Sequence, residues 1–144
     1  MAEGLIQARL AAEDRLGQVS VSSVGTWARP DCPATDKAVI TLAERDIDIS
    51  SHRSREVSAE ILAEADLILV MTRGHQEAIL AEFPEVDGRI HRFSHLDRGA
   101  WDVVDPVSQP LASYQATARE LERLIEAGWS LILGEAAGAA SDGS

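Results

Sequence analysis

The feature that most constrains the fold is an uninterrupted apolar run in the middle of the chain, DLILVM at residues 66–71. A strand with one solvated face alternates apolar and polar residues, whereas a parallel strand covered on both faces is apolar throughout. A helical pattern follows at 74–82, and a shorter, more polar strand is predicted at 88–93. Two strands joined through a helix form a right-handed parallel unit, so this region predicts an α/β fold.

The rest of the chain continues this alternation. Further segments with helical spacing or β-favouring residues are 5–16, 37–46, 59–65 and 111–133 for helices and 18–26 for a strand. The tail at 134–144 is small and polar and is predicted to be disordered. We therefore expect one domain over residues 1–133, with a three-layer α/β/α arrangement around a short parallel sheet.

Composition excludes several classes of function. Thirteen basic and 24 acidic side chains give a net charge of −11, which argues against a nucleic-acid partner. No apolar run reaches the roughly 18 residues of a membrane helix, so no membrane partner is expected. The single cysteine, Cys32, excludes an internal disulfide and favours a cytoplasmic location. His91 and His95 straddle a predicted strand end without a suitable third ligand, so we expect no metal and no cofactor.

Four stretches resemble the low-molecular-weight protein tyrosine phosphatases in their order and spacing. They are SSVGT (22–26), LAERDIDISSHRSR (42–55), ADLILVMTRGH (65–75) and DVVDPVSQPLASYQATARELERLI (102–125). This resemblance implies a four-stranded parallel sheet of order 2-1-3-4 and hydrolysis of phosphoprotein or small phosphate monoesters. The family also includes arginine phosphatases and thioredoxin-linked arsenate reductases. Arsenate reduction needs two further cysteines to relay a disulfide, so that activity is excluded for this chain.

The resemblance also implies that MAEGLIQARL is the family's first helix. A central strand and a phosphate-binding loop of the pattern C-x5-R-S precede this helix in the family, and we expect the chain to lack both. The loop cysteine attacks phosphorus and the arginine holds the phosphate oxygens. Cys32 cannot replace that cysteine, because Pro33 follows it and Ala38 stands where the arginine is needed.

We therefore expect the 144-residue chain to be inactive and a full-length form to act through a phosphocysteine intermediate. The alternative is a non-catalytic, truncated paralogue that serves as a binding module. Without a central strand, the predicted strands at 18–25 and 66–71 would leave backbone groups unpaired, at about 1–3 kcal/mol each. We expect these strands to pair directly, to borrow a strand from a second copy through exposed sheet edges, or to fold poorly.

The resemblance assigns the general acid to Asp105 in the sequence VVDPVSQP. An Asp-Pro pair by itself indicates a turn, but the helix match that follows favours the catalytic role. Asp102 is a weaker acid candidate. Val107 and Ser108 replace the aromatic residue or Phe-Gly pair of many family members, which puts a preference for phosphotyrosine in doubt. The choice between phosphotyrosine and phosphoarginine stays open.

Two other segments contribute candidate residues through the resemblance. Trp27 and Arg29 occupy the loop that borders the family's substrate cleft, and packing of Trp27 on its own loop is the alternative. The segment SHRSR at 51–55 helps to brace the phosphate loop in the family, which makes His52 and Ser54 supporting residues. A solvated basic turn is the alternative for this segment.

Overall fold

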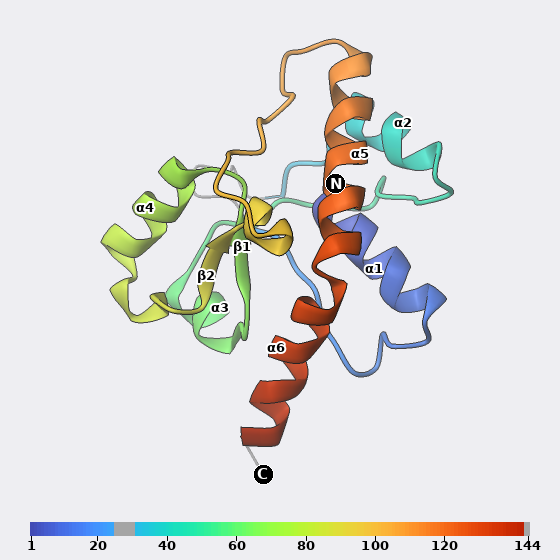
Figure 1. Cartoon of the computed structure of the whole chain (residues 1–144). Coiled ribbons are helices and arrows are strands. Elements are labelled where there is room, and N and C mark those ends of the chain that lie inside the picture. The colour runs from blue at the N-terminus through green and yellow to red at the C-terminus, as the bar shows by residue number, and fades with distance from the viewer. Residues whose placement is uncertain (25–30, 143–144) are drawn as a thin grey trace. The chain divides into compact units, whose positions relative to one another are not determined.

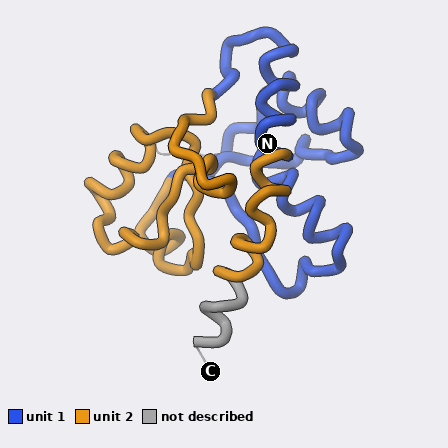
Figure 2. The backbone as a smooth tube through the Cα atoms, viewed as in Figure 1, with its two compact units in different colours: residues 1–56, 105–122 blue, residues 57–104, 123–144 orange. Residues whose placement is uncertain are grey.

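The structure is a computed structural model that describes residues 1–24 and 31–142, with side chains up to residue 135. Within these residues no helix is both long and apolar enough to cross a membrane. The chain divides into two compact units, residues 1–56 with 105–122 and residues 57–104 with 123–144 (Figure 2).

The first unit is built on two short helices, α1 (Ala2–Ala12) and α2 (Asp36–Ala43), and on the first part of α5 (Leu111–Ala127) (Figure 1). Gly4 allows α1 to pack closely within this unit. A Cβ atom on Gly4 would lie 2.9 Å from Ile49 Cγ2 and 3.0 Å from Leu42 Cδ1. The buried side of α1 therefore requires a residue without a side chain at this position.

The second unit contains the sheet, in which β1 (Ile68–Val70) and β2 (Ile90–Arg92) pair in parallel with Ile68 opposite Ile90. Its helices are α3 (Ala59–Glu64), α4 (Arg73–Glu82), η1 (Pro84–Val86), η2 (Phe93–Asp97), the end of α5 and α6 (Trp129–Asp142). An apolar core joins the strands to α3, α4 and η1; its buried members are Leu62, Ile68, Val70, Ile79, Val86 and Ile90. The predicted α/β fold with a short parallel sheet is confirmed.

The prediction of a strand at 18–26 is wrong for residues 18–24, which form no strand in the structure. Residues 25 and 26 lie outside the described residues. A strand is stabilised by a neighbour that satisfies its backbone groups, and the sheet of the described chain consists of β1 and β2. Residues 18–24 instead run beside α1. Gln7 Nε2 donates to the Val21 carbonyl at 3.3 Å, and Ser23 Oγ donates to Glu3 Oε2 at 2.8 Å.

The long helix predicted at 111–133 is two helices, since α5 ends at Ala127 and α6 begins at Trp129. The break falls at Gly128, where a Cβ atom would meet Leu96 Cβ at 2.5 Å and Leu96 Cα at 2.9 Å. Close contact with η2 therefore requires glycine at this point. The tail from residue 134, expected to be disordered, is helical as far as Asp142, in keeping with the high helix propensity of its alanines.

Candidate functional site

The first turn of α1 gathers polar groups from three parts of the first unit. Glu3 Oε2 accepts the Ser23 hydroxyl at 2.8 Å and lies 3.2 Å from His52 Nδ1. Burial lowers the pKa of the Met1 amino group, while the negative charges of Glu3 and Asp105 raise it. The start of α1 is therefore a partly desolvated site whose electrostatics include the Asp105 carboxylate.

Asp105 itself is exposed and closes a turn at the Asp-Pro pair. Its Oδ1 atom accepts the backbone N–H of Val107 at 3.0 Å, and Pro106 between them is buried. No cationic side chain of the described residues pairs with this carboxylate. The turn fixes the backbone while the carboxyl group stays accessible, which is the arrangement that proton transfer to a bound molecule requires.

Asp102 has very different surroundings in the second unit. Its Oδ1 atom accepts the backbone N–H of Arg73 at 2.9 Å, and Arg92 Nη1 lies 3.3 Å away. The Arg73 hydrogen bond is the main reason that the pKa of Asp102 is lowered, and Arg92 adds to the effect. Because Asp102 binds the first N–H of α4 as an anion, it is a poor proton donor near neutral pH.

The two supporting residues predicted in SHRSR bind different partners. His52 reaches Glu3 on α1. Ser54 Oγ accepts the backbone N–H of Cys32 at 3.0 Å, and the Ser54 N–H donates to the Cys32 carbonyl at 2.8 Å. The two arginines of the same segment, Arg53 and Arg55, are exposed.

Trp27 and Arg29 lie outside the described residues. The segments on either side of their loop are anchored, through Ser23 to Glu3 and through Cys32 to Ser54. Glu3 and Ser23 were not singled out from the sequence as site residues. Glu3 is an ordinary first-turn acid of a helix, and no local signal distinguishes it from a helix-dipole charge.

The His91 and His95 rings stack with centroids 4.3 Å apart and planes 11° apart. Burial, followed by the charge of His95, lowers the pKa of His91, and the charge of Glu135 opposes this effect. Among the described residues, no group of three or more His, Cys, Asp or Glu side chains could hold a metal ion.

The sequence and the fold of this chain are similar to those of known phosphatases. The sequence model of the family described as low molecular weight phosphotyrosine protein phosphatase matches residues 1–132, and the chain belongs to this family.

Individual relatives agree with this assignment. A protein-arginine-phosphatase of Bacillus subtilis is 33% identical over 126 residues, which cover 87% of this chain and 82% of the relative. A probable low molecular weight protein-tyrosine-phosphatase, EpsP of Ralstonia nicotianae, is 31% identical over 109 residues, covering 76% and 74%. The crystal structure of a low molecular weight protein tyrosine phosphatase from T. tengcongensis has a TM-score of 0.82 at 35% identity, covering 88% of this chain and 85% of the other.

Proposed function

We propose that this chain carries the general acid of a phosphate-ester hydrolase, and that Asp105 is this acid. The observation that supports the proposal most is the geometry of Asp105, whose exposed carboxyl group is held in a turn by the Val107 N–H at 3.0 Å. A helix N-terminus attracts phosphate through its free N–H groups and its dipole. A carboxyl group within hydrogen-bond reach of a leaving group bound there can protonate it.

The proposed reaction has two steps. A cysteine thiolate attacks phosphorus to form an S–P bond, the bond from phosphorus to the leaving oxygen breaks, and Asp105 protonates that oxygen. Water then attacks the phosphocysteine, the Asp105 carboxylate takes a proton from this water, and the S–P bond breaks to release phosphate. The arginine of the C-x5-R-S pattern would hold the phosphate oxygens in both steps.

The cysteine and arginine of this reaction are not among the 144 residues, because Cys32 is followed by Ala38 at the position of the arginine. We therefore propose that these residues by themselves do not turn over a phosphate ester. They complete an active enzyme when a strand and a C-x5-R-S loop are joined ahead of Met1. The rival function, a non-catalytic binding module, requires that the joined protein stay inactive.

The proposed substrates are phosphorylated proteins of the phosphotyrosine type, acted on in the cytoplasm without a cofactor. Phosphoarginine is the competing class, since one relative is named a protein-arginine-phosphatase. Trp27 and Arg29 are proposed to border the bound substrate. His52 is proposed to hold the start of α1 through Glu3, and Ser54 to hold the segment that begins at Asp31.

The test compares two purified proteins, the 144-residue chain and a version with a strand and C-x5-R-S-P loop from an active family member fused before Met1. Hydrolysis of p-nitrophenyl phosphate is expected from the fused protein alone, because loss of a covalent nucleophile can cost on the order of a million-fold in turnover. Phosphotyrosine and phosphoarginine peptides then assign the substrate class. A folded fusion without activity, or activity of the 144-residue chain, would overturn the proposal.

A further inference from the structure

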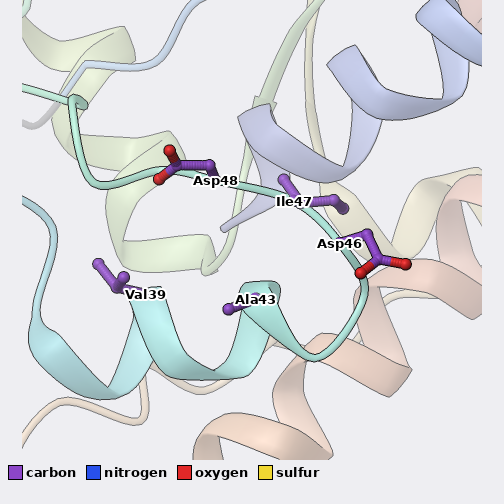
Figure 3. Close-up of a pocket in the computed structure, with 5 residues that line it drawn as sticks. All are labelled: Val39, Ala43, Asp46, Ile47 and Asp48. Carbon is purple, nitrogen blue, oxygen red and sulfur yellow. The ribbon is translucent and has the colours of Figure 1, made fainter.

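Helix α2 has apolar side chains on two faces. Ala38 and Leu42 point into the unit, and Leu42 is 0% exposed. On another face, Val39 and Ala43 line a hollow of about 230 Å³ together with Ile47 of the segment after the helix. Figure 3 shows that this segment runs back alongside α2, with Val39 and Ala43 on the helix side facing it. The floor of the hollow is therefore aliphatic.

Two acidic residues, Asp46 and Asp48, complete the lining of this hollow, and their carboxyl groups point to opposite sides of it (Figure 3). Hydrogen bonds from the Ser50 side chain and backbone lower the pKa of Asp48, so it is ionised at neutral pH. Neither carboxylate has a cationic partner in the part of the chain that the structure describes. The nearby cationic side chain of Arg45 pairs with Glu122 instead, because its Nε atom lies 2.6 Å from Glu122 Oε1.

Exposed apolar surface continues beyond the hollow at Ile40, which is 49% exposed on the same helix. Ala43 is a surface neighbour of both Val39, at i,i+4 spacing, and Ile40, at i,i+3 spacing. This stripe does not contribute to the core of its unit, which uses Ala38 and Leu42. An aliphatic surface bordered by uncompensated negative charge is complementary to a ligand that is aliphatic and positively charged.

We propose that this hollow, lined by Val39, Ala43, Asp46, Ile47 and Asp48, docks a segment of a partner protein in which Lys or Arg residues flank an aliphatic side chain. The aliphatic side chain occupies the floor, and the cations pair with the two carboxylates. Acidic, phosphorylated or nucleic-acid ligands are excluded by the same charges. This docking role is separate from the hydrolase proposed above and does not depend on Asp105.

Binding through one aliphatic side chain and two exposed ion pairs is expected to be weak, with a Kd on the order of 0.1–1 mM. Amide chemical shifts of the 15N-labelled 144-residue chain measure affinities in this range. The probe is the synthetic peptide GKLVKG, acetylated and amidated at its ends. The matched controls are GELVEG, which reverses the charges, and GKSSKG, which removes the aliphatic side chains. Saturable shifts confined to residues 39–48 are expected with GKLVKG alone.

Asp46 offers a closely matched control elsewhere in the unit. Asp46 and Asp14 are both exposed, both follow a helix end, and have backbone φ angles of 58° and 56°. Asp46→Asn and Asp48→Asn are each expected to weaken GKLVKG binding about two- to fivefold, the usual value of an exposed ion pair. Asp14→Asn is expected to leave binding unchanged, and raising the salt to about 0.5 M is expected to weaken it.

Several outcomes would overturn the docking site. Equal binding of GELVEG or GKSSKG would show that charge or shape is not recognised. An equal loss in Asp14→Asn would mean that the overall net charge, and not the hollow, attracts the peptide. Concentration-dependent shifts at residues 39–48 in the absence of peptide would assign the surface to a second copy of the chain. A well-dispersed spectrum that GKLVKG leaves unchanged would also reject the site.

Discussion

Asp102 and Asp105 belong to the same short stretch, DVVD, yet their surroundings differ completely. Asp102 accepts a backbone N–H of α4 at 2.9 Å and lies 3.3 Å from Arg92. Asp105 accepts one N–H from its own turn and has no cationic side-chain partner among the described residues. The first carboxylate is used to fasten a helix to a loop, whereas the second stays accessible. Hydrogen-bond partners, and not residue type, separate a structural acid from a candidate catalytic acid.

The largest effect is expected for Asp105→Asn in the fused, active protein. An amide cannot protonate the leaving oxygen, so kcat should fall by about 10²- to 10⁴-fold. Steady-state hydrolysis of p-nitrophenyl phosphate measures this loss. The urea midpoint of the variant should equal that of the parent, because the carboxylate forms one exposed hydrogen bond within its own turn. A normal kcat in this variant would contradict the assignment.

The pH profile sharpens the same comparison. General-acid catalysis makes kcat depend on pH, so activity of the fused protein should decline on the alkaline side. Asp105→Asn should remove that decline, whereas Asp102→Asn should retain it. Measured kcat across the pH range distinguishes the two residues. Loss of the alkaline decline in Asp102→Asn would exchange their roles.

A moderate effect on stability is expected for Glu3→Ala in the 144-residue chain. This change removes the acceptor for Ser23 and the partner of His52, and it should lower the free energy of unfolding by about 1–3 kcal/mol. Glu13→Ala, at the other end of α1, removes exposed pairs with Arg9 and Arg15 and should cost at most about 1 kcal/mol. Urea denaturation followed by circular dichroism gives both values. Equal losses in the free energy of unfolding would mean that the contacts of Glu3 stabilise the unit no more than the exposed pairs of Glu13 do.

The smallest effect is expected for Asp102→Asn, and it should depend on pH. The folded state lowers the pKa of Asp102, so this residue stabilises the fold above the pKa of the unfolded carboxyl group, about 4, and the contribution disappears as pH falls through the folded value. The Tm of the variant should be slightly below that of the parent at pH 7 and should converge with it in acid. A Tm difference that persists at low pH would mean that the Asp102 charge is not the cause.

Local sequence patterns were sufficient to predict most of the helices and strands. The apolar run at 66–71 contains β1, and the spacing at 74–82 matches α4, because a buried strand and an amphipathic helix are each encoded within a few neighbouring residues. The same approach failed at 18–26, where β-favouring residues form no strand over the described part. Strand pairing depends on a neighbour that can be distant in the sequence, and local propensity does not reveal whether that neighbour is there.

The candidate site, like the fold, could be predicted from the sequence only in part. The Asp-Pro pair and the helix after it were enough to select Asp105 and to rank Asp102 below it, although that ranking awaits the kinetic test. The contacts of Glu3 with Ser23 and His52 could not be predicted, because these residues are separated by 20 or more positions and none has an unusual local pattern. Such contacts are selected by packing of the whole unit.

The sequence by itself determined the family, the α/β class and the parallel β1–β2 pair joined through α4, since these follow from the order of motifs and from local periodicity. Only the tertiary structure decided that Gly128 divides the last helix, that Asp102 binds Arg73, and that an aliphatic hollow lies between α2 and Asp48. Each of these results depends on which distant atoms approach within a few ångströms. Those distances are set when the chain packs, and they are not encoded in any short stretch of it.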